Sequence, residues 1–222
     1  AMPKLNSPSP STPMRTRKTQ AQRREETRLK LVQGAVALLK KKRYAGFRVA
    51  DVTTMSGVSR GAQSHYFPMK DDLVIEALEF VFKETQANAL AKIAKAKTHP
   101  DQLLQALIAD SKDFFLGENF YLSLDLMMVG GEEPLGQAVQ RLAQNYRVSV
   151  ENAWREVFRA SGYSASTADE VVSLTFCVVR GLSIRKIIGP DTSRIPHMIK
   201  LWKQQATLLL ESDLERKNKK KP

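Results

Sequence analysis

The residues between Val52 and Phe67 are the ones best suited to contact another molecule. Gly57, Ser59 and Arg60 fall within four positions, and mostly small side chains follow them. A glycine at this place can end a helix in the left-handed conformation. The Ser59 hydroxyl can then accept a hydrogen bond from a free N–H at the start of a second helix. Helix, three-residue turn and helix is the geometry that places a second helix in a DNA major groove.

The N-terminal half of this second helix presents side chains that suit close contact with DNA. Its exposed positions are predicted to be Ser59, Arg60, Gly61, Ala62 and Ser64. Small side chains let the helix backbone approach the duplex, while the Arg60 guanidinium can donate to guanine O6 and N7 or to a phosphate. A helix this short has too little apolar surface to serve as a core element. Double-stranded DNA is therefore the predicted partner.

Apolar residues recur at helical spacing through the rest of the chain. Residues 14–28 can start a helix whose apolar face runs from Leu29 to Leu39, and a break is predicted at residues 44–46. Two short helices are predicted near Val49–Ser56 and Ser59–Tyr66, and a long one begins near Lys70. Further helices are predicted at residues 101–116, 119–129, 135–161, 165–188 and 193–214. No alternating strand pattern of convincing length appears, so the predicted fold class is all-α.

Positive charge is concentrated at the two ends of the 222-residue chain. Residues 1–72 hold 15 Lys and Arg against 5 Asp and Glu, residues 73–214 hold 15 against 17, and residues 215–222 hold 5 against 1. This asymmetry fits a nucleic-acid-binding N-terminal part on a nearly neutral body, although basic ends can also serve solubility alone. The proline-rich residues 1–14 are expected to be disordered, and residues 215–222 are expected to form a solvated basic tail.

The segment Arg24–Leu78, about a quarter of the chain, resembles the DNA-binding domain of the TetR family of transcriptional regulators. The resemblance rests on the runs Gly57–Ala62, His65–Pro68 and Lys70–Leu73, together with Ala35, Leu38-Leu39 and the pattern Val49-x-Asp51-Val52. It implies an N-terminal three-helix, helix-turn-helix DNA-binding domain at residues 15–70. It also implies a C-terminal helical domain for ligand binding and dimerisation at residues 71–214.

The resemblance implies roles for single positions. The positions that face base edges or phosphates on the family's recognition helix correspond here to Arg60, Gly61, Ser64 and His65. The residue at Tyr66 commonly reaches a backbone phosphate. Lys70, at the start of the fourth helix, is expected to hold a phosphate with its ammonium group or with nearby backbone N–H groups.

Three positions depart from the family pattern. Ser64 stands where the family often has a tyrosine, which calls one usual phosphate or thymine contact into question. Arg48 stands where a threonine or serine usually caps the second helix; it cannot cap in that way, but it can reach a phosphate directly. Met69 replaces the usual small polar cap before Lys70. We interpret these departures as altered sequence specificity rather than loss of DNA binding.

In the family, the helical body usually encloses an apolar cavity whose ligand changes the spacing of the two DNA-reading domains. Methionine and aromatic side chains suit an adaptable apolar pocket. The candidate lining residues are Phe115, Met127, Met128, Trp154, Phe158 and Phe176, each of which can equally be plain core. Their apolar character favours a hydrophobic or aromatic effector over a sugar phosphate.

The segments Val171–Ile188 and Ile199–Leu210 are apolar on more than one face. A helix that buries two faces is central or lies at an interface, and the resemblance implies that the last two helices form a four-helix dimer interface. A symmetric dimer reads a pseudo-palindromic site. The predicted function is therefore that of a homodimeric repressor, released from its operator by a small apolar or aromatic effector. Residues 15–24 can add minor-groove or phosphate contacts.

Other functions have less support in the sequence. Cys177 is interpreted as a buried small hydrophobe, although a redox role of its thiol stays open. The histidines show no metal-ligand spacing, so neither a metal nor another cofactor is expected. No paired carboxylates, activated serine or Cys/His couple marks a catalytic site, which leaves a small all-α enzyme as the least favoured alternative. The other alternative is a helical interaction protein that dimerises without sequence-specific DNA binding. No apolar run is long enough for a membrane span, no secretory signal is found, and a cytoplasmic location is expected.

Overall fold

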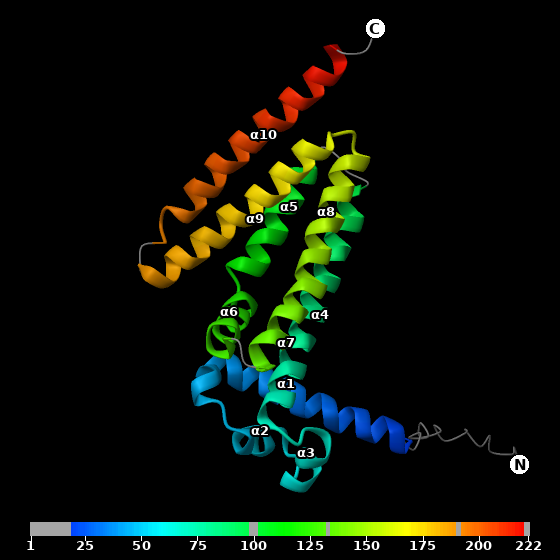
Figure 1. Cartoon of the computed structure of the whole chain (residues 1–222), viewed down its shortest axis with the longest axis vertical. Coiled ribbons are helices and arrows are strands. Elements are labelled where there is room, and N and C mark those ends of the chain that lie inside the picture. Colours follow the sequence, from blue (N-terminus) through cyan, green and yellow to red (C-terminus); the bar gives the residue numbers. More distant parts are fainter. Residues whose placement is uncertain (1–18, 98–101, 132–133, 190–191, 220–222) are drawn as a thin grey trace, which may run out of the picture.

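The protein is described by a computed structural model that covers residues 19–97, 102–131, 134–189 and 192–219. Every regular element within these ranges is helical, as the sequence predicts. Figure 1 shows α1 (Gln20–Gly46) across one end of the molecule, α2 (Val49–Ser56) and α3 (Arg60–Tyr66) beyond it, and α4 (Lys70–Lys97) rising away from them. The predicted disorder of residues 1–14 lies outside the described residues, as do residues 15–18 of the predicted basic arm.

The remaining helices form a body together with α4 (Figure 1). They are α5 (Leu103–Phe115), α6 (Glu118–Gly130), α7 (Pro134–Ala143), α8 (Ser149–Ala160), α9 (Ala165–Ile188) and α10 (Ile195–Lys219). Helix α6 packs against α1, α8 packs against α4 and α9, and α10 covers one side of α9 (Figure 1). The predicted single helix at residues 135–161 is divided by a π-helical segment, Gln144–Val148. Below, α1–α3 are called the head and α4–α10 the body.

Helix α1 has a well-defined start and an unusual end. Its start is a capping box, in which the Thr19 side chain accepts from the Gln22 N–H and the Gln22 side chain accepts from the Thr19 N–H. Near its end, Arg43 has φ 59° and ψ 173°, which is not helical. The break therefore falls one residue before the predicted Tyr44–Gly46 turn, although Gly46 is still counted in the helix.

A small apolar core holds the head on α4. Phe47, Val52, Phe67 and Leu73 are all buried and come from the segments around α2, α3 and the start of α4. Fully burying one such side chain contributes about 1.5–3 kcal/mol. Short helices such as α2 and α3 are marginal on their own, so this shared core is what fixes their orientation.

Large buried side chains form the core of the body, and hydrogen bonds join the start of α9 to α10. Trp154, Phe158 and Phe176 are fully buried, and the indole Nε1–H of Trp154 donates to Asp110 Oδ2 at 2.9 Å. The start of α9 is capped by Ser164 and joined to α10 through Asp213.

The predicted solvated tail at residues 215–222 is corrected in part by the structure. Helix α10 continues to Lys219, where the sequence analysis ends it at residue 214. Two hydrogen bonds support the extra turn: Arg216 Nε donates to the Ser212 carbonyl at 3.2 Å, and Lys217 Nζ donates to the distant Gly162 carbonyl at 2.6 Å. Residues 220–222 lie outside the described part of the chain.

Candidate nucleic-acid interface and ligand cavity

The turn between α2 and α3 has the geometry that its sequence predicts. Gly57 ends α2 in the left-handed conformation, with φ 65° and ψ 26°. The Val58 N–H donates back to the Thr53 carbonyl at 3.2 Å. Ser59 then caps α3, because its hydroxyl accepts from the Ala62 N–H at 3.2 Å. Local hydrogen bonds thus define the turn, while the shared apolar core fixes the orientation of the two helices.

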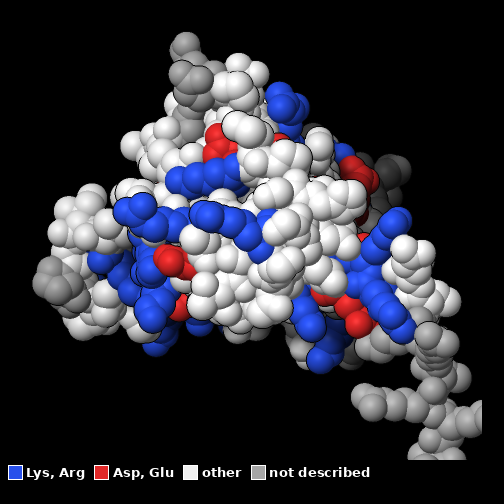
Figure 2. All heavy atoms as spheres, turned by 90° about the horizontal axis from the view of Figure 1, so that it is seen from below, with Lys and Arg blue, Asp and Glu red and all other residues white. Residues whose placement is uncertain are grey.

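The residues predicted to contact DNA lie on the head and at the start of α4. Six of them are exposed: Arg48, Ser59, Arg60, Gly61, Ser64 and His65. Three are half-buried: Ala62, Tyr66 and Lys70. Figure 2 looks at this end of the molecule and shows more Lys and Arg side chains than acidic ones. The arrangement offers an exposed guanidinium at Arg60 and open helix backbone at Gly61 to an approaching anion.

A buried glutamine fixes the recognition helix, and sequence reasoning missed it. Gln63 is buried, and its Nε2 donates to the Phe67 carbonyl at 2.6 Å. This bond satisfies a carbonyl at the end of α3 and turns the opposite face of the helix outward. Ser64 lies on that outward face, and its hydroxyl donates to the Arg60 carbonyl at 3.0 Å. A glutamine in a polar-looking run carries no pattern that would reveal its burial.

Lys70 is held in place by Tyr44. Its Nζ lies 3.7 Å from the centroid of the Tyr44 ring and donates to the Tyr44 carbonyl at 3.4 Å. The Tyr44 hydroxyl in turn donates to Asp71 Oδ1 at 2.7 Å. Burial and the neighbouring Asp71 carboxylate raise the pKa of the Tyr44 phenol to about 12, so it stays a neutral donor at physiological pH. The ammonium group is thereby oriented at the start of α4, and no carboxylate of the described residues forms an ion pair with it.

Arg48 and Met69 behave as the departures from the family pattern suggest. Arg48 precedes α2 in an extended conformation, and its side chain makes no capping hydrogen bond. The Met69 N–H, which has no small polar cap beside it, is instead accepted by Asp72 Oδ2 at 3.0 Å. A carboxylate in the first turn of α4 therefore supplies one half of a capping box, the bond back to the N–H of the preceding residue.

The body contains a cavity of about 390 Å³ between α4, α5, α6, the π-helical segment and α9. Its apolar walls include Phe82, Phe114, Phe115, Phe120, Leu124 and Met127. Its polar lining comes from Ser123, Gln144, Arg147, Glu151 and Arg180. The volume lies in the range of sites for small organic ligands.

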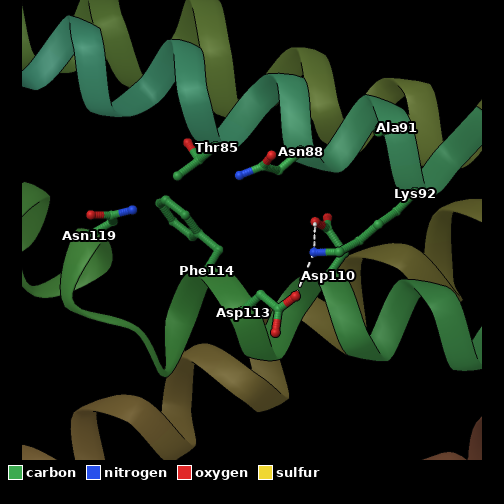
Figure 3. A pocket seen from close by; sticks show the side chains of 8 residues that line it. All are labelled: Thr85, Asn88, Ala91, Lys92, Asp110, Asp113, Phe114 and Asn119. Atoms are coloured by element: carbon green, nitrogen blue, oxygen red, sulfur yellow. Dashed lines mark hydrogen bonds and ion pairs between the residues drawn. The ribbon is translucent and has the colours of Figure 1, made fainter.

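A second, more polar hollow of about 330 Å³ lies between α4 and α5. Lys92 Nζ lies 2.6 Å from Asp113 Oδ2 and 3.6 Å from Asp110 Oδ1, and both contacts can be followed in Figure 3. Asp110 also accepts from Trp154, so its charge is satisfied from two sides. Phe114 lines both this hollow and the aromatic cavity. The charged groups of the hollow mainly bind one another, which suits a structural role.

Comparison with known proteins identifies the class. No family model matches the chain. The HTH-type transcriptional regulator CymR from Pseudomonas putida is 39% identical over 179 residues, which make up 80% of this chain and 88% of CymR. The chain belongs to the TetR family of transcriptional regulators. The predicted family and the all-α, helix-turn-helix fold are thus confirmed.

Solved structures support the fold of this TetR-family regulator. A transcriptional regulator from Saccharomonospora viridis, in complex with choline, superposes with a TM-score of 0.64 at 19% identity, over 81% of this chain and 95% of that one. A TetR transcription regulator from Haloarcula marismortui gives a TM-score of 0.63 at 18% identity, over 85% of this chain and 98% of that one. Identity this low supports the shared fold alone.

The structure places the predicted ligand-binding residues of the regulator in three settings. Phe115 and Met127 line the aromatic cavity. Trp154, Phe158 and Phe176 are buried outside its lining and pack as core. Met128 also lies outside the lining, and 77% of its surface is exposed. The arginines of the lining, Arg147 and Arg180, were not predicted.

Cys177 of the regulator is exposed, which corrects the predicted burial. It lies on an outward stripe of α9 with Leu174, Gly181 and Ile188, all exposed. The sequence shows a Val/Phe neighbourhood, but it does not show that α9 has two apolar faces of which the chain itself covers only one.

The described residues contain no group of three or more His, Cys, Asp and Glu arranged to hold a metal ion. Within the same residues, no helix has both the length and the apolar character that a membrane crossing requires.

Proposed function

We propose that the regulator binds a pseudo-palindromic operator as a homodimer, represses transcription, and is released by a small apolar or aromatic effector. The observation that carries this proposal is the exposed face of α3, where Arg60, Gly61 and Ser64 project beside the Tyr44-oriented Lys70. Arg60 reads bases or phosphate, and Lys70 holds a phosphate. On this proposal residues 15–70 form the DNA-binding domain and residues 71–214 the ligand-binding and dimerisation domain, with Lys70 at the junction.

The dimer is proposed to form through α9 and α10. Both helices leave large apolar side chains exposed on their outer faces: Leu174, Ile187, Ile188, Met198, Leu201 and Leu208. Leu201 and Leu208 are seven residues apart and so share one face of α10. Exposed apolar side chains on two helices that pack together mark an interaction site, and a second copy of the same helices completes a symmetric four-helix contact. In the dimer, Cys177 becomes covered.

This interface predicts a specific loss of the dimer. Leu174→Glu together with Leu208→Glu is expected to give a monomer, measured as a halved mass by size-exclusion chromatography with light scattering. Leu90→Glu, at an exposed leucine on α4, is the matched control and should leave the mass unchanged. A dimer that survives the double substitution would place the interface elsewhere.

Release by an effector is supported by the connection of the cavity to the head. Helix α6 lines the cavity, and its Asp125 accepts a hydrogen bond from the Tyr44 N–H at 2.9 Å. A ligand that binds better when α6 is displaced therefore disfavours the DNA-binding position of the head. Among fold relatives, the Saccharomonospora viridis regulator was solved with choline, which supports a ligand-binding body in this fold.

The test is selection of bound sequences from fragmented genomic DNA by the purified protein near physiological salt. Recovery of one pseudo-palindrome, with poor competition by random DNA, is the expected result. The double variant Arg60→Ala, Lys70→Ala should then lose operator binding while keeping the dimer. Arg141→Ala with Lys112→Ala removes the same charge from exposed positions outside the head and should bind normally.

Three results would contradict the proposal. Equal enrichment of all DNA would mean that α3 no longer reads sequence. Operator affinity that does not change between low and moderate salt would mean that the phosphate contacts are wrong, since each neutralised phosphate releases counterions. Loss of the dimer in the Arg60→Ala, Lys70→Ala variant would favour the alternative of a helical interaction protein.

A further inference from the structure

The two arginines of the cavity lie over aromatic rings. The Arg147 guanidinium carbon lies 3.6 Å from the centroid of the Phe114 ring, and that of Arg180 lies 5.3 Å from the centroid of Phe115. The one carboxylate in the lining, Glu151, pairs with Arg155 at 3.5 Å. Within the described part of the chain, neither cavity arginine forms an ion pair. The lining therefore holds two arginines without an ion pair to any described residue and one carboxylate, Glu151, that is already paired with Arg155.

The backbone presents Arg147 to the cavity through an uncommon helix geometry. Arg147 belongs to the π-helical segment Gln144–Val148, and π-helical turns are rare and frequent at functional sites. The segment is anchored by Tyr146, whose hydroxyl donates to Glu79 Oε1 at 2.7 Å and whose ring stacks on Phe82. With Tyr146 held on α4, the next side chain is directed into the cavity, beside Gln144 and Val148.

This position is unfavourable for a cation unless an anion joins it. The pKa of the Arg147 guanidinium is lowered to about 10, mainly by burial and to a smaller extent by nearby Arg180. The Asp110 and Glu151 carboxylates act in the opposite direction. Arg147 still carries its charge at pH 7. A desolvated cation whose direct contact is a ring face loses hydration that a cation–π contact and more distant carboxylates replace incompletely. An incoming carboxylate compensates for the lost hydration and can accept two parallel guanidinium hydrogen bonds.

We propose that the cavity selects a monoanionic aromatic ligand of the arenecarboxylate class. The ring lies among Phe114, Phe115 and Phe120, and the carboxylate binds Arg147, with Arg180 as the second cation. A cavity of about 390 Å³ fits a single substituted ring. Organic cations are disfavoured by the two arginines, and sugar phosphates by the aromatic walls. This inference rests on the proposed function, because it names the chemistry of the proposed effector.

Binding of three matched probes to the purified full-length protein tests the proposal. The probes are 4-ethylbenzoate, its neutral isostere 4-ethylbenzamide and the cation 4-ethylbenzylammonium, measured by calorimetry at pH 7. The benzoate is expected to bind about tenfold to hundredfold more tightly than the amide, as one charge-assisted contact predicts. The ammonium probe should bind most weakly.

Substitutions assign the selectivity to the cavity arginine. Arg147→Met should remove the preference for benzoate over the amide while leaving the affinity for the amide nearly unchanged. Arg147→Lys, which keeps the charge but loses the planar fork, should retain part of the preference. Arg141→Met, at an exposed arginine on α7 outside the cavity, is the matched control and should behave as wild type. Circular dichroism confirms that each variant is folded.

The operator complex separates this inference from the proposed function. Benzoate binding that needs Arg147 and releases the operator supports both. Benzoate binding that needs Arg147 but leaves the operator complex intact supports the cavity chemistry and contradicts the effector role. Equal affinity for the amide and the benzoate, or a preference that survives in Arg147→Met, overturns the proposed anion selectivity. Absence of binding by all three probes overturns it as well, whatever the operator result.

Discussion

The backbone N–H of Tyr44 donates to Asp125 Oδ2 at 2.9 Å, and this bond ties the head to the helix that lines the cavity. The N–H is available because Arg43 leaves the helical conformation and interrupts the hydrogen-bond ladder of α1. Asp125 lies on α6, between the cavity residues Leu124 and Met127. A displacement of α6 therefore acts on the same tyrosine whose ring and carbonyl orient Lys70.

Asp125→Ala is expected to loosen this connection. Removing the acceptor leaves the half-buried Tyr44 N–H without a partner and lowers the free energy of unfolding by about 1–3 kcal/mol. Because local opening governs amide exchange, the Tyr44 amide should exchange faster in native-state hydrogen exchange. Glu118→Ala is the control, since Glu118 approaches Lys40 only at 4.0 Å on the surface. Unchanged exchange at Tyr44 in Asp125→Ala would show that the bond does not hold the head.

Arg43→Gly is expected to stabilise the protein. Arg43 has φ 59° and ψ 173°, a conformation that glycine adopts without the steric cost that a side chain adds. Relief of this strain should raise the free energy of unfolding by about 1 kcal/mol. The measurement is urea denaturation.

Lys41→Gly gives the matched control two residues earlier. Lys41 is exposed and lies in the regular part of α1, where glycine costs about 1 kcal/mol. The two substitutions should therefore move stability in opposite directions. Destabilisation by both would mean that Arg43 is not strained in the folded protein.

We predict that Gly61 is needed for DNA binding and not for folding. A Cβ atom added there meets no other atom within 4 Å, and the residue lies in a helix, where glycine is unfavourable. Gly61→Ala should thus raise stability by about 0.5–1 kcal/mol. Gly61→Leu should lower operator affinity by about tenfold or more, the worth of one good base contact, because its side chain separates α3 from the duplex.

Ala87→Leu on α4 is the control for the bulky substitution, since Ala87 is also exposed and lies away from the head. It should leave operator affinity unchanged in a titration of labelled operator DNA. Full affinity in Gly61→Leu would mean that this face of α3 does not approach DNA closely.

The helix-turn-helix could be predicted from the sequence because its determinants are local. Gly57 must end one helix and Ser59 must cap the next, and both effects act over three or four residues. The helices of the body followed from apolar spacing in the same way. The end of α10 did not, because its last turn depends on Lys217 reaching the Gly162 carbonyl, 55 residues away in sequence.

The cavity could be predicted only in part, because its walls come from distant segments. Periodicity shows that Phe115 and Phe176 face inward, but it cannot show that one meets empty space and the other meets core. The π-helical segment adds a second obstacle. It shifts the helical phase within residues 144–148, so a standard helical projection does not place Arg147 at the cavity. Cys177 was misplaced for a related reason, since exposure of one face of α9 depends on what covers it.

The contact between Asp213 and the start of α9 predicts a defined pH dependence. The carboxylate accepts from the Ser164 N–H at 2.9 Å, from its hydroxyl at 2.7 Å and from the Thr167 hydroxyl at 3.0 Å. Burial alone raises the pKa of this carboxyl, but the hydrogen bonds and nearby Lys217 outweigh it, so the pKa lies below the ordinary 3.8. A lowered pKa means that the stabilisation is complete above about pH 4 and is lost as the pH falls through the folded-state value.

Asp213→Asn should therefore lower the free energy of unfolding by about 1–3 kcal/mol at pH 7, because it weakens a charged, buried acceptor. The difference between wild type and variant should stay constant down to about pH 4 and shrink below it, as protonation makes the wild-type side chain neutral too. Urea denaturation at several pH values measures this difference. Glu215→Gln, at an exposed acid one half-turn further along α10, should show no such dependence. A difference that grew towards low pH would mean that the neutral carboxyl is the form that the folded protein prefers, and the assigned hydrogen bonds to Ser164 and Thr167 would be wrong.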